Sequence, residues 1–256
     1  MLKTCLQHPL TRGLDIDDPQ TTNLRRRIIA EKPFLRRIYQ EWYADIAAAL
    51  PPPPGTVLEL GSGAGFLAEM LPDMFASDIM LCPHIDAVLD GHALPVRARS
   101  LRAIVMTNVF HHLAQPRRFL AEAARCVRPG GALVLVEPWV TPWSRLIYTR
   151  LHHEPFDPDA AAWEFPPSGP LSGANGALPW IIFQRDRDRL RVEFPEWRLD
   201  TITPIMPLRY LLSGGVSLRS LMPGWSFGLW RGVEGLLDPW ANDLAMFARI
   251  VLIRGD

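Results

Sequence analysis

The chain is poor in cysteine, in lysine and in net charge, and each shortage excludes a class of protein. Its 256 residues include three cysteines, Cys5, Cys82 and Cys126, and no Cys-x-x-Cys pair. This pattern fits neither a disulfide framework nor a structural zinc site, so we expect a reducing, cytoplasmic location. The formal net charge is zero and no long basic block occurs, which argues against a nucleic-acid partner. Lys3 and Lys32 are the only lysines, and we infer no function from that bias.

Long hydrophobic runs are also missing. No uninterrupted apolar segment follows a basic region near the N-terminus, so no signal peptide is expected. The charges Arg231, Glu234 and Asp238 break the most apolar C-terminal stretch and exclude a bilayer span there. With 48% apolar residues and a mean hydropathy near zero, the chain has material for one substantial α/β core.

The sequence does contain a glycine-rich loop directly after a short apolar run. Residues 57–65 read Val-Leu-Glu-Leu-Gly-Ser-Gly-Ala-Gly. Glycine tolerates both a sharp turn from strand to helix and a close approach of the backbone to a ligand. Residues 66–71 then predict a short helix whose first N–H groups suit polar ligand groups, and Pro72 ends it. The pattern therefore indicates a cofactor loop.

The spacing of the glycines decides which cofactor loop it is. A dinucleotide fingerprint has glycine at its first, third and sixth positions, but Phe66 occupies the sixth position here. The pattern Glu59-x-Gly61-x-Gly63-x-Gly65 instead resembles motif I of the class I S-adenosyl-L-methionine-dependent methyltransferases. The resemblance implies a Rossmann-like α/β fold: a seven-stranded, mostly parallel sheet with an antiparallel last strand and helices on both faces. It covers residues 55–138 and is closest to methyltransferases of ubiquinone and menaquinone biosynthesis.

The segments after the loop continue the resemblance. Residues 74–78 predict a second strand ending in Asp78, which would bind the ribose hydroxyls. Residues 88–95 are similar to the stretch in which the family places an acid, here Asp90, against the adenine amino group. Residues 100–113 and 128–137 resemble the fourth and fifth strands with their loops. By this resemblance the cofactor-binding residues are Glu59, Gly61, Ser62, Gly63, Gly65, Asp78, Ile79, Asp90, Gly91 and Asn108.

One segment departs from the family. Only eleven residues separate Asp78 from Asp90, so a full second crossover helix does not fit. The apolar wall against the adenine would then come from Ile79, Met80 or the N-terminal segment.

We expect one domain over residues 1–256, with a helical cap over 1–54, the cofactor-binding core over 55–138 and the substrate side over 139–256. Asp18 and Pro33 predict the starts of two N-terminal helices. These helices either cover the cofactor or simply pack, with Arg25-Arg26-Arg27 in solvent. Pro116 opens an amphipathic helix between the fourth and fifth strands.

The C-terminal part is more irregular. Residues 139–180 predict a loop-rich stretch that we assign to substrate binding, and 181–194 predict a helix. Residues 197–203 and 246–254 predict the sixth and seventh strands. Between them, residues at helical spacing form an apolar stripe, for which core packing is favoured over an apolar pocket or a membrane surface. The stripe comprises Trp225, Leu229, Val233, Leu236 and Trp240, beside a flat face of Gly224, Gly228 and Gly232.

Candidate catalytic groups follow the fourth strand. Methyl transfer is an in-line displacement, so alignment supplies most of the rate and a base is optional. His111 lies at the carboxyl edge of the sheet, and we expect it to accept a proton or orient the substrate. His112 should point elsewhere and pack. The expected substrate-binding residues are Glu137, which is otherwise a cap, and Tyr148 and His153.

No metal is expected. His152, His153, Glu154 and Asp157 match no ligand spacing, and adjacent histidines on a helix diverge.

The functional hypothesis is methyl transfer from S-adenosyl-L-methionine to oxygen or carbon of an apolar, amphipathic or lipid-like small molecule. Peripheral membrane contact and the oligomeric state stay open. Two alternatives are an NAD-type oxidoreductase, disfavoured by Phe66, and a non-catalytic module that keeps the fold and binds a partner.

Overall fold

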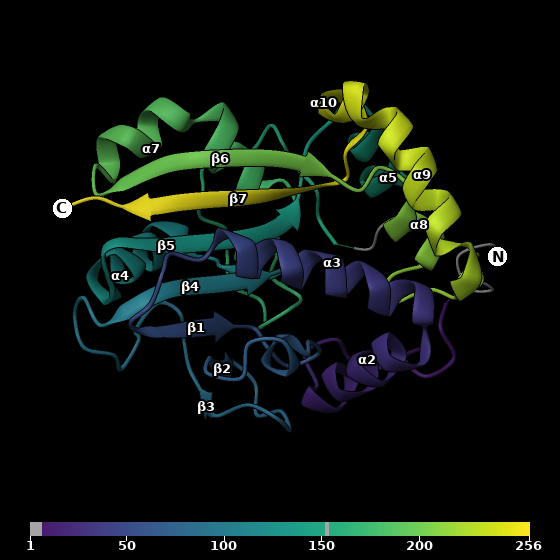
Figure 1. Ribbon diagram of the computed structural model, residues 1–256, viewed down its shortest axis with the longest axis horizontal. Coiled ribbons are helices and arrows are strands. Elements are labelled where there is room, and N and C mark those ends of the chain that lie inside the picture. Colours follow the sequence, from purple (N-terminus) through teal and green to yellow (C-terminus); the bar gives the residue numbers. More distant parts are fainter. Residues whose placement is uncertain (1–6, 152–153) are drawn as a thin grey trace.

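The computed structural model describes residues 7–151 and 154–256 and is built on one seven-stranded sheet (Figure 1). The strand order is β3-β2-β1-β4-β5-β7-β6, with β7 antiparallel to both of its neighbours and the other neighbouring pairs parallel. The predicted fold class is therefore confirmed. The strands are β1 Thr56–Leu60, β2 Phe75–Asp78, β3 Ala87–Val88, β4 Leu101–Thr107, β5 Val127–Pro138, β6 Trp197–Ile205 and β7 Phe247–Arg254.

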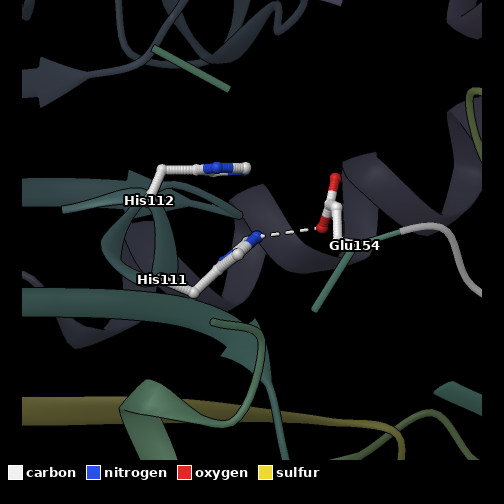
Figure 2. A group of neighbouring side chains, drawn as sticks. All are labelled: His111, His112 and Glu154. Carbon is white, nitrogen blue, oxygen red and sulfur yellow. Dashed lines mark ion pairs between the residues drawn. The ribbon is translucent and has the colours of Figure 1, made fainter. Parts of the chain in front are cut away.

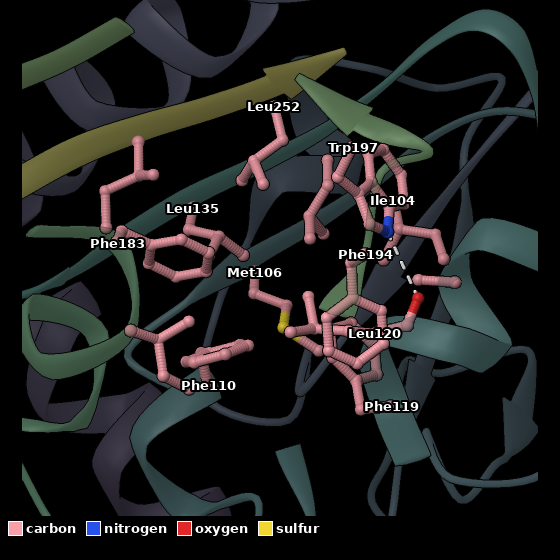
Figure 3. Close-up of a cluster of buried hydrophobic side chains, with 14 of the residues drawn as sticks. Ile104, Met106, Phe110, Phe119, Leu120, Leu135, Phe183, Phe194, Trp197 and Leu252 are labelled. Carbon is pink, nitrogen blue, oxygen red and sulfur yellow. Dashed lines mark hydrogen bonds between the residues drawn. The ribbon is translucent and has the colours of Figure 1, made fainter. Parts of the chain in front are cut away.

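Helices cover both faces of the sheet because the central strands are apolar on both sides. In β4, Ala103 and Val105 pack with α3 (Pro33–Ala49), whereas Ile104 and Met106 pack with α4 (Pro116–Cys126) on the opposite face. Figure 3 shows the second of these clusters, which also takes in side chains from the 181–197 segment. There the Trp197 indole N–H donates to the Leu120 carbonyl at 3.1 Å, so the one polar atom of that ring is satisfied in the core.

The N-terminal helices begin where the sequence predicts. Helix α2 spans Pro19–Glu31, and the Asp18 side chain caps it by accepting from the Gln20 N–H at 2.8 Å. Helix α3 begins at Pro33 and buries Trp42 and Tyr43 completely. Both helices have proline in their first turn, where the missing N–H costs nothing.

Three predicted elements differ from the structure. Residues 66–71 contain only a 3₁₀ turn, η1 Leu67–Glu69, in place of a helix. The stretch predicted as loop-rich contains α5 (Pro142–Leu151) and the short α6 (Leu178–Trp180). The helix predicted over 181–194 is divided at Asp186 into a π-helical turn, η3 Ile181–Arg185, and α7 Arg187–Glu193.

The apolar stripe near the C-terminus is exposed, so the favoured prediction of core packing is wrong. Helix α9 (Phe227–Leu237) lies between α8 (Arg209–Ser213) and the pair η5 (Asp238–Trp240) and α10 (Ala241–Leu244), after the turn η4 (Gly224–Ser226). It docks through Phe227 and Glu234 instead, because Phe227 packs on Phe34 and Glu234 pairs with Arg209. The exposed fractions are 81% for Trp225, 65% for Leu229, 75% for Leu236 and 56% for Trp240.

The predicted glycine face packs closely at Gly224, where a Cβ would lie 2.9 Å from Pro33. At Gly228 and Gly232 no described atom would lie within 4 Å of a Cβ, so that part of the face is open. Within the described ranges, no helix combines the length and the apolar character needed to cross a membrane.

Candidate active site

A cavity of about 250 Å³ opens where the parallel strands β1, β2 and β4 end. Gly61, Asp78 and Asn108 line one side of it, and His111 and Tyr148 line the other. Open α/β sheets bind ligands at this edge because the loops after neighbouring strands separate there. One cavity thus brings together residues predicted for the cofactor and residues predicted for the chemistry.

The glycine loop has no room for side chains. Gly61 has a positive φ of 78°, and a Cβ there would collide with Val109. The Gly63 N–H donates to Asp78 Oδ2 at 2.9 Å, and a Cβ on Gly63 would lie 2.8 Å from the same oxygen. Both glycines are therefore required by the geometry of the loop, and Gly61 also lines the cavity.

Asp78 ends β2 with its carboxylate at the cavity. The Met80 N–H donates to its Oδ1 at 2.8 Å. Burial raises the pKa of Asp78, although the backbone N–H groups of Met80 and Gly63 oppose this change. Each carboxylate oxygen accepts more than one hydrogen bond, so Asp78 can still receive hydroxyl donors from the cavity.

Glu59 lies behind the loop and does not line the cavity. Its Oε2 accepts from the Ser62 hydroxyl at 2.5 Å. Burial raises the pKa of Glu59 to about 7, with a smaller contribution in the same direction from Asp78. The carboxyl group therefore changes its protonation near neutral pH, one layer below the predicted cofactor site.

Of the other predicted cofactor residues, some line the cavity and some do not. Ile79 and Asn108 line the cavity, and Asn108 has a positive φ of 57°. Asp90 is half exposed and accepts from the His92 N–H at 2.8 Å, while Gly91 packs on Leu60 and Phe119. Ser62, Gly63 and Gly65 lie in the loop behind the lining. The roles of these residues stay predictions.

The shortened segment behaves as predicted. Residues 79–86, which are all described, pass from β2 to β3 without a helix. The Ile79 side chain stays 47% exposed beside the cavity.

His111 is held from behind by a buried carboxylate. Its Nδ1 lies 2.6 Å from Glu137 Oε2, and the Val109 and Phe110 N–H groups both donate to Glu137 Oε1 at 2.8 Å. Glu137 is fully buried at the end of β5, so it caps the turn η2 (Phe110–His112) and orients His111 without lining the cavity. Burial alone would lower the pKa of His111, but Glu137 and Glu154 outweigh it and raise this pKa to about 9.

His112 was expected to point away from the cavity and to pack, but it lines the cavity. The rings of His111 and His112 instead lie side by side, with centroids 4.1 Å apart, and both residues line the cavity. The His112 Nδ1 lies 3.1 Å from the Gly173 carbonyl oxygen. Burial and the neighbouring His111 lower the pKa of His112 to about 3.

Several lining residues were not predicted as site residues. Thr22 and Arg25 come from α2, Tyr39 comes from α3, and Glu154 and Tyr210 come from the C-terminal part. Of the two alternatives for the N-terminal helices, covering the site or simply packing, the structure therefore has the first. The arginine run at 25–27 is a sequence signal for Arg25, but nothing in the sequence distinguishes Arg25 from Arg26 and Arg27.

Of the predicted substrate-binding residues Tyr148 and His153, the structure describes only the first. Tyr148 lines the cavity, and its hydroxyl donates to the Met246 carbonyl at 2.9 Å. His153 lies outside the described residues.

Comparison with known proteins agrees with this architecture. A model of the methyltransferase domain family matches residues 33–198. An uncharacterised methyltransferase of Mycobacteroides abscessus is 27% identical over 201 residues, which is 64% of this chain and 74% of that protein. One from Mycobacterium leprae is 29% identical over 131 residues, or 41% of this chain, and the match spans about half of that relative, 49%.

Solved structures show the same fold. The geranyl diphosphate C-methyltransferase of Streptomyces coelicolor, solved with S-adenosyl-L-homocysteine, has a TM-score of 0.52 at 14% identity and covers 97% of this chain and 91% of its own. The CMeT domain of the citrinin polyketide synthase has a TM-score of 0.51 at 16% identity over 94% of this chain and 58% of that one. With the family match over more than half of its length, the chain belongs to the methyltransferase domain family, within the class I S-adenosyl-L-methionine-dependent methyltransferases.

Proposed function

We propose that this protein transfers the methyl group of S-adenosyl-L-methionine to an oxygen or carbon atom of a partly apolar small molecule. The observation that carries this proposal is the single cavity that joins Gly61, Asp78 and Asn108 to His111 and Tyr148. The bare backbone of Gly61 lines this cavity beside the Asp78 carboxylate, so the residues present fit the cofactor. When bound, the cofactor supplies an electrophilic methyl group.

The cofactor end is formed by the loop after β1 and by Asp78. The bare backbone at Gly61 lets a ligand approach closely, and Asp78 accepts hydrogen bonds from paired hydroxyls. Arg25, the one lysine or arginine among the described lining residues, offers a guanidinium to a carboxylate. Asp90 and Gly91 stay proposed contacts of the adenine end.

The acceptor end is mostly apolar. Ile147, Phe156 and Phe247 line it together with Tyr148 and Tyr210. Such walls exclude water and favour an apolar or amphipathic acceptor, including a lipid-like one. His111, held in place by Glu137, lines this space, where it orients the acceptor or, in its neutral form, accepts its proton. We propose a cytoplasmic location and a small-molecule partner, with no nucleic acid.

Calorimetric titration with S-adenosyl-L-methionine, S-adenosyl-L-homocysteine and NAD tests the cofactor. We expect both adenosyl ligands to bind wild type, and Asp78→Asn to weaken them at least tenfold. Asp73→Asn, an exposed acid just before β2, is the matched control and should bind as wild type does. Preference for NAD would support the oxidoreductase alternative, and failure of the folded protein to bind any of the three would support a non-catalytic module.

The role of His111 is tested by turnover. With an acceptor found by screening apolar alcohols, phenols and quinols for release of S-adenosyl-L-homocysteine, His111→Ala should lower kcat about 100-fold or more. Its affinity for S-adenosyl-L-methionine should stay within twofold. Equal losses of turnover and cofactor affinity would contradict a role at the acceptor.

A further inference from the structure

Three potential metal ligands meet inside the cavity. His111, His112 and Glu154 each offer one ligand atom, and these atoms all lie within 4.8 Å of one another (Figure 2). We propose that these three residues bind a divalent transition-metal ion. The sequence predicts no metal here, because Glu154 lies far along the chain from His111 and His112.

The first support is the way in which both rings are held. The Gly173 carbonyl oxygen can only accept a hydrogen bond, so the His112 Nδ1 carries the proton and its Nε2 has a free lone pair. Glu137 Oε1 accepts from two backbone N–H groups, and Glu137 Oε2 accepts a hydrogen bond from the Nδ1–H of His111. Metal-binding histidines are oriented in this way, with the second ring nitrogen donating to a carboxylate or a carbonyl.

The second support is distance. The His111 Nε2 lies 3.5 Å from Glu154 Oε2. Two ligand atoms on one tetrahedral ion at about 2.0–2.1 Å are separated by about 3.3 Å. The His111–Glu154 pair is therefore already close to the required separation, and all three ligand atoms lie within 4.8 Å of one another.

The third support is the position of the cluster. The side chains of His111 and Glu154 are 3% and 17% exposed, and all three residues line the cavity. They come from two segments, since η2 supplies the histidines and the chain after α5 supplies the carboxylate. A bound ion would therefore connect the loop after β4 to the chain after α5, on the two sides of the cluster.

The donor set indicates the class of ion. Two imidazoles and one carboxylate suit zinc, iron(II) and similar ions, whereas magnesium and calcium prefer oxygen ligands. Three protein ligands leave at least one coordination position open, as in catalytic sites. Provided that the proposed methyl transfer is correct, the open position would face an acceptor oxygen, and His111 would orient the acceptor through the ion.

Cobalt(II) is a suitable probe because its visible absorption reports its coordination. We expect one cobalt ion per chain to bind to the metal-free protein, in the absence of cofactor, and zinc to displace it. His112→Gln and Glu154→Gln should each weaken binding at least tenfold. Glu137→Gln, a positioning variant that touches no metal, should weaken it about 10–100-fold. His84→Asn, an exposed histidine whose positive φ asparagine tolerates, is the control and should bind as wild type does.

Thermal unfolding of each variant without metal shows whether it is folded. Glu154 is partly exposed, so Glu154→Gln remains informative if His112→Gln does not fold. Absence of cobalt binding to wild type would overturn the proposal, as would binding that neither folded variant weakens. Because the titration uses no cofactor, its failure leaves the binding of S-adenosyl-L-methionine as a separate question, decided by Asp78→Asn.

Discussion

Among single residues, Glu59 makes the stability of the cofactor loop depend on pH. Its ordinary pKa is 4.5, and burial raises it to about 7 in the folded protein. Between these values the folded state holds the proton more tightly than the unfolded state. The stabilisation is thus complete below pH 4.5 and is lost as the pH rises through 7.

We therefore expect Glu59→Gln, which mimics the protonated form, to match wild type near pH 4 and to be more stable by about 3 kcal/mol near pH 8. Urea unfolding at several pH values measures the difference in free energy of unfolding between the variant and wild type. Other groups titrate alike in both proteins, so their contributions cancel. Glu31→Gln, an exposed partner of Arg27, is the control and should show a constant difference. A constant difference for Glu59→Gln would contradict the raised pKa.

Lys32 connects the helical cap to the loop that closes the cavity. Its ammonium donates to the carbonyl groups of Ser213, Gly215 and Leu218, at 3.0, 2.7 and 2.5 Å. Burial lowers its pKa to about 8, so it is still mostly charged at pH 7. Lys32→Met leaves these carbonyls without their donor, and we expect it to lower the free energy of unfolding by about 2–3 kcal/mol.

Arg27→Met is the matched control, since it removes a cation from the exposed i,i+4 pair with Glu31 and should cost about 0.5 kcal/mol or less. Urea unfolding of both variants at pH 7 compares them. Equal costs would show that the three hydrogen bonds of Lys32 contribute nothing to stability.

The residues of the glycine loop were predictable and the histidine–glutamate cluster was not. The loop depends on spacing within nine consecutive residues, and sterics alone require glycine at positions 61 and 63. His111 and His112 are adjacent in the turn η2, and no local pattern predicts that their rings lie side by side. Glu154 reaches them through tertiary folding, which no local pattern encodes.

Among the elements, α9 has two apolar faces with different environments. Phe227 is 6% exposed, packs on Phe34 with ring centroids 5.2 Å apart, and lies 4.8 Å from the Arg209 guanidinium. Leu229 is 65% exposed. We expect Phe227→Ala to cost about 3–4 kcal/mol and Leu229→Ser to change stability by about 0.5 kcal/mol or less.

Chemical unfolding of the two variants at one protein concentration measures both costs. A cost for Leu229→Ser similar to that for Phe227→Ala would mean that the exposed stripe is covered in solution.

Elements with strong end signals were predicted better than those without. Asp18, Pro33 and Pro116 mark helix starts that the structure keeps. Helix α5 was missed, because its flanking prolines and tryptophans suggested a loop. The stripe of α9 was misassigned since periodicity shows that a helix has an apolar face but not what covers that face.

At the scale of the whole molecule, the sheet was predictable and the roof of the cavity was not. Motif I and the segments after it each predict a strand of the sheet, one after another along the chain. The roof combines α2, α3, the chain after α5 and the loop over 214–218. These segments meet only because both ends of the chain fold over the carboxyl edge of the sheet.

This arrangement means that a ligand in the cavity stabilises the fold as a whole. S-adenosyl-L-methionine at 100 times its Kd should add about 2.7 kcal/mol, and for a chain of this size each kcal/mol raises Tm by about 2–4 °C. We therefore expect a Tm increase of about 5–10 °C in wild type and in His111→Ala, at most about half of that increase in Asp78→Asn at the same ligand concentration, and none with NAD. Differential scanning calorimetry with and without ligand measures it. An equal increase in Asp78→Asn would place the cofactor away from β2, whereas loss of the increase in His111→Ala would mean that the cofactor, and not the acceptor, occupies the histidine end of the cavity.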